Sequence, residues 1–210
     1  TGSYEPGTRW VMAGEPSEVM IRQRPAGAAP CLRGWADALP LKSGSVDAAM
    51  ALLTVHHWTN LERGLGEMAR VACKRVVLLT FVPESERFWL EDYFPEITAL
   101  DEAIFPGTAA LTALLERLVG PTTITIVPIP HDCTDGFQGA YWRRPEAYLR
   151  AEVRGAISTF AKLDPEPGLQ RLRADLASGR WAARYGDLLD RADLDLGYRI
   201  VCCEIAPSAW

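Results

Sequence analysis

A run of mostly apolar residues, 46–53, ends abruptly in a polar cluster. The run does not alternate between apolar and polar residues, which predicts a strand of a parallel sheet with helices covering both faces. Thr54, His56, His57 and Trp58 follow it directly. Because ligands of open parallel sheets bind just beyond the carboxyl ends of the strands, we expect a site at this position.

Strands and helices alternate along the rest of the chain. The sequence pattern predicts strands over 10–14, 29–33, 75–81, 122–127 and 198–205. It predicts helices from Ser17 to about Arg24, from Thr59 or Asn60 through Ala72, and over 109–119. This alternation predicts an α/β fold, a doubly wound and mostly parallel sheet flanked by helices.

The segment 131–195 differs from what precedes it. It is predicted to form several helices that start near prolines, and the last strand follows it. We therefore predict an α/β domain over 1–130 and 196–210, and a helical cap over 131–195 on the substrate side.

Size and charge restrict the classes of partner. A chain of 210 residues with a net charge of -5 is long enough for a full core, and it lacks the Lys/Arg runs on which nucleic-acid binding depends. No apolar run approaches the roughly 20 residues of a membrane helix. We expect a soluble, cytoplasmic protein with a small-molecule or protein partner and no role for membrane or nucleic acid.

The chain has five cysteines, an odd number. Two of them are adjacent in an apolar run, where they face opposite sides of a strand. These features predict buried free thiols in place of a disulfide framework or a metal site. The cysteines are Cys31, Cys73, Cys133, Cys202 and Cys203.

Several short motifs, in this order and spacing, resemble the class I S-adenosylmethionine-dependent methyltransferases. They are Thr1-Gly-Ser3 as the tail of a glycine-rich loop, Glu15 at the end of the second strand, 36–40, Ser45-Val-Asp47 opening the fourth strand and His56-His-Trp58 closing it. The resemblance covers about residues 1–82 and the last strand. It implies a Rossmann-like sheet of seven strands, with an antiparallel last strand inserted beside 75–81.

The resemblance also implies S-adenosylmethionine as cofactor. Glu15 would accept hydrogen bonds from the ribose hydroxyls, and the backbone N–H of Ala36 would bind adenine, with Met20 and Leu39 beside the ring. The absence of a side chain at Gly2 would let the backbone approach the cofactor. The expected cofactor-binding residues are Thr1, Gly2, Ser3, Glu15, Pro16, Met20, Trp35, Ala36, Leu53 and Thr54.

The chain departs from the family pattern at two places. It begins inside the glycine-rich loop, so the expected first strand is missing, and we expect that further residues precede Thr1. The family often has an Asp where this chain has Trp35, so adenine is expected to be held by stacking. Two simpler interpretations stay open: Thr1-Gly-Ser3 as the remnant of a tag, and Glu15 as an acid at the start of a helix.

The sequence says less about the residues that bind the methyl acceptor than about those that bind the cofactor. The loop 131–144 combines glycines with aromatic and ionisable residues, as substrate loops do, although Tyr141 and Trp142 are equally consistent with packing beneath the cap. Expected substrate-binding residues are Tyr4, His56, Tyr141 and Trp142. The aromatic residues of 88–105 are interpreted as core or dimer contacts.

A base is needed only if the acceptor loses a proton, and His57 or His131 are the candidates. Because His56 and His57 are adjacent, we expect their rings to point to different sides, which leaves one of them a structural role. The two histidines lack a partner at i, i+4 and no pair of acids accompanies them, so we do not expect a metal site.

The predicted function is methyl transfer to a small organic acceptor. Three alternatives stay open: a cofactor-binding scaffold with non-methylating chemistry such as cyclisation, an NAD-binding oxidoreductase, and a non-catalytic binding module. A homodimer is also expected from the aromatic segment.

Overall fold

The computed structural model describes residues 5–85 and 88–206. The chain forms two compact units. Unit 1 lies within residues 1–79, 112–123 and 201–210, and unit 2 within 80–111 and 124–200. The predicted division into an α/β domain and a cap over 131–195 stays a prediction, although all of residues 131–195 belong to unit 2.

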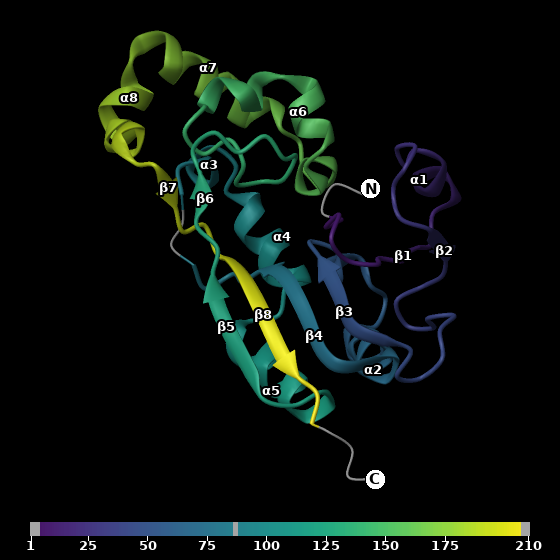
Figure 1. Cartoon of the computed structure of the whole chain (residues 1–210). Coiled ribbons are helices and arrows are strands. Elements are labelled where there is room, and N and C mark those ends of the chain that lie inside the picture. Colours follow the sequence, from purple (N-terminus) through teal and green to yellow (C-terminus); the bar gives the residue numbers. More distant parts are fainter. Residues whose placement is uncertain (1–4, 86–87, 207–210) are drawn as a thin grey trace. The chain divides into compact units, whose positions relative to one another are not determined.

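The described strands form three sheets (Figure 1). A parallel pair consists of β1 (Ala13–Glu15) and β2 (Cys31–Arg33). A four-stranded sheet has the order β3 (Val46–Leu52), β4 (Ala72–Phe81), β8 (Tyr198–Glu204) and β5 (Thr122–Ile126). A short antiparallel pair, β6 (Ile129–Pro130) and β7 (Asp193–Leu194), was not expected from the sequence.

Strand β8 runs against its neighbours. The amide of Val82 donates to Gly197 O and that of Ile205 to Lys74 O, so residue numbers rise on β4 as they fall on β8. Figure 1 shows the β8 arrow pointing opposite to those of β3, β4 and β5. The prediction of a mostly parallel α/β sheet with an antiparallel last strand beside β4 is confirmed.

The seven-stranded sheet that the resemblance implies is not continuous in the described residues, in keeping with the expectation that its first strand is missing here. The strands β1 and β2 form a sheet of their own, and within 5–85 and 88–206 strand β3 is hydrogen-bonded to β4 alone.

The expectation that both faces of β3 are covered is wrong. Alternate residues of β3 point to opposite faces, and Ala51 is buried whereas Met50 is 51% exposed. Helix α2 (Leu61–Val71) packs along β3 and covers one face through its apolar stripe of Leu65 and Met68.

The predicted helix starts of unit 1 are confirmed. Ser17 accepts a hydrogen bond from Met20 N and caps α1 (Glu18–Arg22). Asn60, one of the two predicted residues, caps α2 by accepting from Arg63 N at 2.9 Å. Both caps satisfy amides that lack a partner within their helix.

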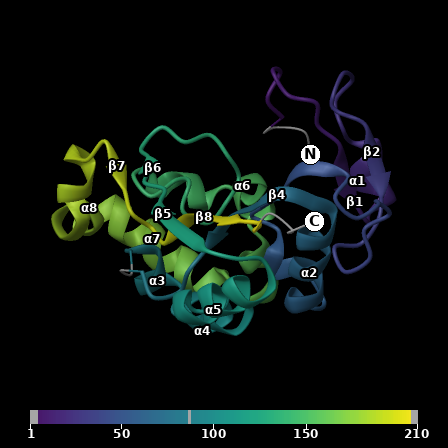
Figure 2. The same cartoon turned by 60° about the horizontal axis from the view of Figure 1, so that its bottom comes forward.

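Unit 2 contains most of the remaining helical elements (Figure 2). Helix α5 (Thr108–Leu118) begins in unit 2 and continues into unit 1. The others are α3 (Leu90–Tyr93), α4 (Glu96–Ile104), η2 (Pro145–Leu149), α6 (Ala151–Gly155), η3 (Ser158–Lys162), α7 (Glu166–Ser178), α8 (Arg180–Tyr185) and η4 (Gly186–Asp190). Prolines lie at the starts of η2 and α7, as predicted.

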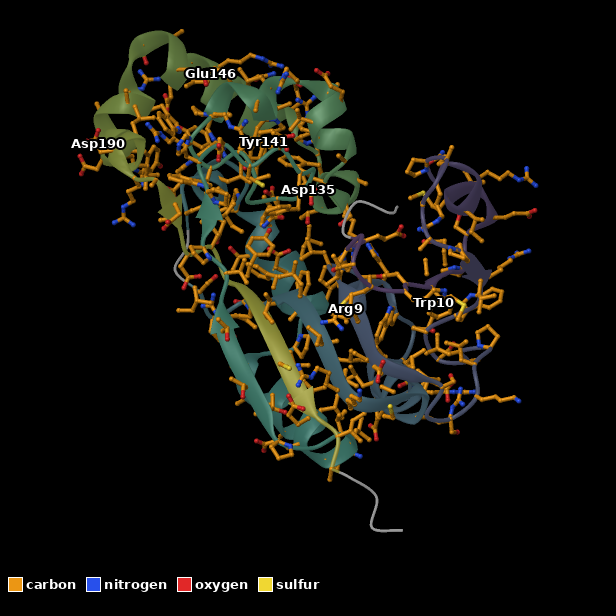
Figure 3. The ribbon with its side chains drawn as sticks, in the orientation of Figure 1. Arg9, Trp10, Asp135, Tyr141, Glu146 and Asp190 are labelled. Atoms are coloured by element: carbon orange, nitrogen blue, oxygen red, sulfur yellow. The ribbon has the colours of Figure 1, made fainter. Side chains whose placement is uncertain are left out.

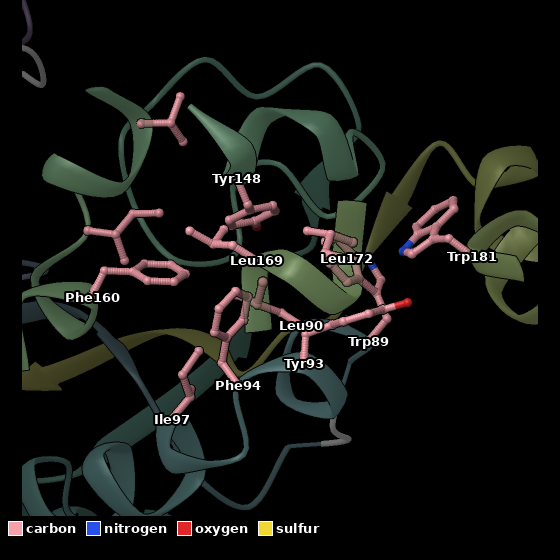
Figure 4. Close-up of a cluster of buried hydrophobic side chains, with 12 residues drawn as sticks. Trp89, Leu90, Tyr93, Phe94, Ile97, Tyr148, Phe160, Leu169, Leu172 and Trp181 are labelled. Carbon is pink, nitrogen blue, oxygen red and sulfur yellow. The ribbon is translucent and has the colours of Figure 1, made fainter. Parts of the chain in front are cut away.

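An aromatic core holds unit 2 together (Figure 4). The ring of Trp89 makes edge-to-face contacts with Tyr93, Tyr148 and Trp181, and its indole N–H donates to Trp142 O at 2.6 Å. At Gly168 a Cβ atom would lie 2.4 Å from the Phe94 ring, so only glycine lets α7 pack this closely against Phe94. The core interpretation of the aromatic segment holds for Trp89, Tyr93 and Phe94, which are buried and offer no dimer surface.

The five cysteines are free thiols, as predicted. The prediction that they are buried holds only for Cys203, since Cys73 is exposed and the other three are half-buried. In the part of the chain that the structure describes, no helix has the length and apolarity needed to cross a membrane.

Candidate functional site

The carboxyl ends of β1 and β2 bring the two best-defined predicted residues to one sheet edge. Glu15 and Arg33 are paired in the parallel register, and the amide of Gly34 donates to Glu15 O. The turn from Trp35 to Ala38 follows at once, closed by the bond from Ala38 N to Trp35 O. Glu15 and Ala36 thus stand at adjacent strand ends within unit 1, where ligands of open parallel sheets bind.

The Glu15 carboxylate is held in place locally. Its Oε1 accepts a hydrogen bond from Ser17 N at 2.8 Å, and the residue is half-buried. A carboxylate offers about four acceptor positions, so one local bond leaves capacity for two ligand hydroxyls. The arrangement accommodates both the helix-start and the ribose-binding interpretations.

The other predicted residues around this edge are largely exposed. Met20 on α1 is 37% exposed, and Trp35 is 56% exposed on the turn. Pro16 is exposed, and its carbonyl accepts from the Arg33 guanidinium. Exposed apolar side chains of this kind are available to pack against an amphipathic ligand.

Two residues of α2 that sequence reasoning missed hold the segment after Ala36. The carboxylate of Glu67 accepts from Leu39 N at 2.8 Å, and the Arg70 guanidinium donates to Leu39 O and Leu41 O. Glu67 and Arg70 are themselves paired at 2.6 Å. The hydrogen bond from Arg70 and that from Leu39 N keep the pKa of Glu67 below its usual value. The only signal in the sequence is their i, i+3 spacing.

Leu53 directly follows β3 in a strained conformation. Its φ of 50° lies in the left-handed region, which a branched apolar residue seldom adopts, and its amide donates to Leu79 O at 2.8 Å. Such backbone outliers cluster at ligand sites. The predicted residues Leu53 and Thr54 thus lie at a strand end with an unusual backbone conformation.

The two adjacent histidines form part of a 3₁₀ turn, Val55–His57. Their ring centroids lie 3.9 Å apart, so the expectation that they point to different sides is wrong. The tight turn after β3 replaces the extended backbone on which that expectation relied. His57 is exposed and His56 is half-buried. Trp58 packs on Gly64, where a Cβ would come within 2.4 Å of the ring.

The loop 131–144 is tightly bonded within unit 2 (Figure 3). Trp142 is fully buried and its indole N–H donates to Ile129 O at 3.0 Å. Tyr141, labelled in Figure 3, is half-buried beneath the Arg144 guanidinium. His131 is exposed, and its amide donates to Ala192 O. Burial of Trp142 supports its packing role, while Tyr141 and His131 keep surfaces that a ligand can reach.

Four predicted residues lie outside the described residues. They are Thr1, Gly2, Ser3 and Tyr4. Among the residues that are described, no group of three His, Cys, Asp or Glu side chains is arranged to hold a metal ion.

Comparison with known proteins points to one family. A family model described as a methyltransferase domain matches residues 5–80. A crystal structure from Anabaena variabilis ATCC 29413, assigned as a methyltransferase from an antibiotic biosynthesis pathway, shares 37% sequence identity and a TM-score of 0.86, covering 92% of this chain and 81% of that one. No curated protein matches significantly.

More distant structures share the fold. One is a Thermotoga maritima methyltransferase assigned as a possible histamine N-methyltransferase, with 15% identity, a TM-score of 0.53, and coverage of 92% of this chain and 72% of that one. Another is the YcgJ protein of Bacillus subtilis, with 12% identity, a TM-score of 0.51, and coverage of 92% and 81%.

Proposed function

Since the chain belongs to the S-adenosylmethionine-dependent methyltransferases, we propose that it transfers a methyl group to a small organic acceptor. The enzyme class and the cofactor follow from the family. The acceptor class is our proposal. It is supported by the net charge of -5 and by the absence of Lys/Arg runs, which argue against a nucleic-acid acceptor.

The observation that carries the cofactor assignment is the placement of Glu15 beside the 35–38 turn. A carboxylate fits two vicinal ribose hydroxyls, and a backbone amide at Ala36 fits a ring nitrogen of adenine. Trp35 adds an exposed ring for stacking. We assign ribose binding to Glu15, adenine binding to Ala36 and Trp35, and the positioning of their segment to Glu67 and Arg70.

Bound S-adenosylmethionine supplies an activated methyl group for in-line displacement. The protein contributes by aligning the acceptor and excluding water, and alignment of this kind is worth about 7 to 11 kcal/mol in favourable cases. For an acceptor that must lose a proton, we propose His57 or His131, both exposed, as the base. If His57→Gln leaves turnover unchanged at every pH, His57 is not the base. The same test with His131→Asn decides the role of His131.

One pair of titrations tests the proposal. We expect S-adenosylhomocysteine to bind in isothermal titration calorimetry and NAD not to bind. Glu15→Gln should weaken S-adenosylhomocysteine binding at least tenfold, and Glu18→Gln, an exposed acid on α1, should leave it unchanged. Binding of NAD alone, or full affinity in Glu15→Gln, contradicts the assignment.

The finer function needs a second measurement. Incubation with S-adenosylmethionine and a library of small acceptors should yield S-adenosylhomocysteine in proportion to methylated product, detected by mass spectrometry. Conversion of an acceptor without formation of S-adenosylhomocysteine would favour the alternative of a non-methylating reaction. A cytoplasmic location and a homodimer stay predictions of the sequence.

A further inference from the structure

Strand β2 carries the turn to which we assign adenine, yet little apolar packing holds it. It has three residues and pairs with β1 alone among the described strands. Cys31 and Leu32 are half-buried, and Arg33 is exposed. A two-stranded pair of this length is marginally stable in water, so other contacts must fix the position of the turn.

A carboxylate and a guanidinium hold the backbone just before β2. Glu5 Oε2 accepts a hydrogen bond from Ala29 N at 2.7 Å, and Arg24 Nη2 donates to Ala29 O at 2.9 Å. The same Arg24 nitrogen donates to the other carboxylate oxygen of Glu5. The pair therefore satisfies both polar backbone groups of Ala29, as a neighbouring strand would.

This pair is largely shielded from solvent. The side chains of Arg24 and Glu5 are 9% and 19% exposed, whereas those of the pair Arg22 and Glu18 on α1 are 75% and 55% exposed. The hydrogen bonds from Ala29 N and Arg24 keep the pKa of Glu5 below its usual value, so Glu5 is ionised at neutral pH. Charge-assisted bonds of this kind fix geometry well, and the loss of one partner leaves the other charge unpaired.

A second pair of the same kind holds the chain after the turn. Glu67 accepts from Leu39 N at 2.8 Å, and Arg70 donates to Leu39 O at 3.0 Å. Both polar backbone groups of Leu39 are thus held as those of Ala29 are. The segment 29–39 is fixed at each end by one acid and one arginine, with β2 and the turn between them.

We infer that Glu5 and Arg24 are positioning residues of the adenine site. They hold the chain at the amino end of β2, whereas Ala36 lies beyond its carboxyl end, so their effect on adenine passes through the strand. Without them β2 can shift or fray, which moves the Ala36 amide away from the base. A binding site needs such support to keep its geometry within about 0.5 Å. The assignment rests on the proposed function in naming adenine as the ligand.

Two ligands that differ in adenine test the inference. S-adenosylhomocysteine and S-ribosylhomocysteine share the ribose, the sulfur atom and the amino acid, and only the first carries the base. We expect Glu5→Ala and Arg24→Ala each to weaken S-adenosylhomocysteine binding at least fivefold in isothermal titration calorimetry of the full chain. Binding of S-ribosylhomocysteine should stay unchanged. A merely structural loss would weaken both ligands alike.

The matched controls remove the exposed pair on α1. Glu18→Ala and Arg22→Ala should bind both ligands as the unchanged chain does. The double variant of Glu5→Ala with Arg24→Ala removes both charges together, and it should show the same loss of S-adenosylhomocysteine affinity. It decides the test if a single variant, left with an unpaired charge, fails to fold.

Hydrogen exchange tests the positioning without any ligand. The Ala38 amide donates to Trp35 O and closes the turn. We expect it to exchange at least fivefold faster in Glu5→Ala and in Arg24→Ala, whereas the amide of Phe94, in the core of unit 2, keeps its rate. Equal losses for the two ligands, unchanged S-adenosylhomocysteine affinity in both single variants, or unchanged Ala38 exchange overturns the inference.

The two proposals fail separately. If the unchanged chain does not bind S-adenosylhomocysteine while Ala38 exchange rises in the variants, the ligand assignment is wrong and the pair still positions the turn. If S-adenosylhomocysteine binds with the same affinity to the unchanged chain and to the variants, the ligand assignment stands and the positioning role is wrong.

Discussion

The two units stabilise themselves in different ways. Unit 2 has a core of twelve buried residues, half of them aromatic, which cluster around Trp89 (Figure 4). Among residues 5–40 of unit 1, by contrast, only Gly34 is buried, and Trp10 is 75% exposed (Figure 3). This segment is held by polar contacts such as the pair of Glu5 and Arg24 and the bonds of Glu67 to Leu39.

The contrast indicates which part is available for ligand. Apolar burial supplies most folding free energy, so a segment with little of it opens locally at low cost. The expected cofactor-binding residues lie in such a segment. Part of the binding energy of the cofactor then goes into ordering residues 13–41, and hydrogen exchange there should slow when the cofactor binds.

The largest expected difference compares two tryptophans. Trp89→Ala should reduce the free energy of unfolding of unit 2 by about 4 kcal/mol, because it removes a buried ring and leaves Trp142 O without its donor. Trp10→Ala should change stability by less than about 0.5 kcal/mol, because the side chain is mostly exposed. Urea unfolding followed by fluorescence measures both. Equal losses of unfolding free energy in the two variants would contradict the contrast between the units.

Asp101 gives unit 2 a pH response opposite in sign to that of Glu67 in unit 1. Burial, with a contribution from Glu91, raises the pKa of Asp101 from 3.8 to about 6. Because the folded pKa exceeds the unfolded one, this group favours folding below pH 3.8, and the benefit is lost as pH rises through 6, a change of about 3 kcal/mol.

The substitution Asp101→Asn should remove this dependence and stabilise unit 2 at pH 8. Hydrogen exchange of the Phe105 amide, which donates to Asp101 O, reports it locally when pH 5 and pH 8 are compared after correction for intrinsic rates. The same pH slope in Asp101→Asn as in the unchanged chain would show that another group is responsible.

The contribution of Glu67 to stability should depend on pH in the opposite sense to that of Asp101. Its pKa is lowered, so its stabilisation is present above the usual value of 4.5 and is lost as pH falls below it. Glu67→Gln should increase exchange of the Leu39 amide and destabilise the segment by about 1.5 kcal/mol. Glu62→Gln, which breaks an exposed pair between α2 and Arg117 of α5, is the control and should have almost no effect.

The smallest expected effect concerns the strained Leu53. Leu53→Gly should change stability by less than about 1 kcal/mol, because relief of the left-handed conformation offsets the lost packing. Leu53→Val should be clearly less stable than Leu53→Gly, since a branched Cβ worsens the strain. Calorimetry with S-adenosylhomocysteine then shows whether the glycine variant loses affinity. Unchanged affinity would remove Leu53 from the cofactor site.

The sequence predicted the elements with strong local signals. Apolar runs located β3, β4 and β8, and cap residues located the starts of α1 and α2 within one residue. The family resemblance, not periodicity, placed β8 beside β4.

What could not be predicted depends on contacts between distant residues. The anchoring of Leu39 by Glu67 joins residues 28 apart, and the bond from Gln138 to Asp101 joins residues 37 apart. Neither leaves a local pattern. The sequence did not predict the exposure of Met50. A run of apolar residues is compatible with burial of both faces of a strand, but it does not show which elements cover each face.

The place of β8 in its sheet has a consequence for biosynthesis. Strand β8 pairs with one edge of β4 and with β5, yet the ribosome makes it after the whole of segment 82–197. Until then the nascent chain displays two incomplete strand edges, which are templates for mispairing. We therefore expect premature stop codons before residue 198 to give aggregated, chaperone-bound polypeptide, with no smaller functional fragment.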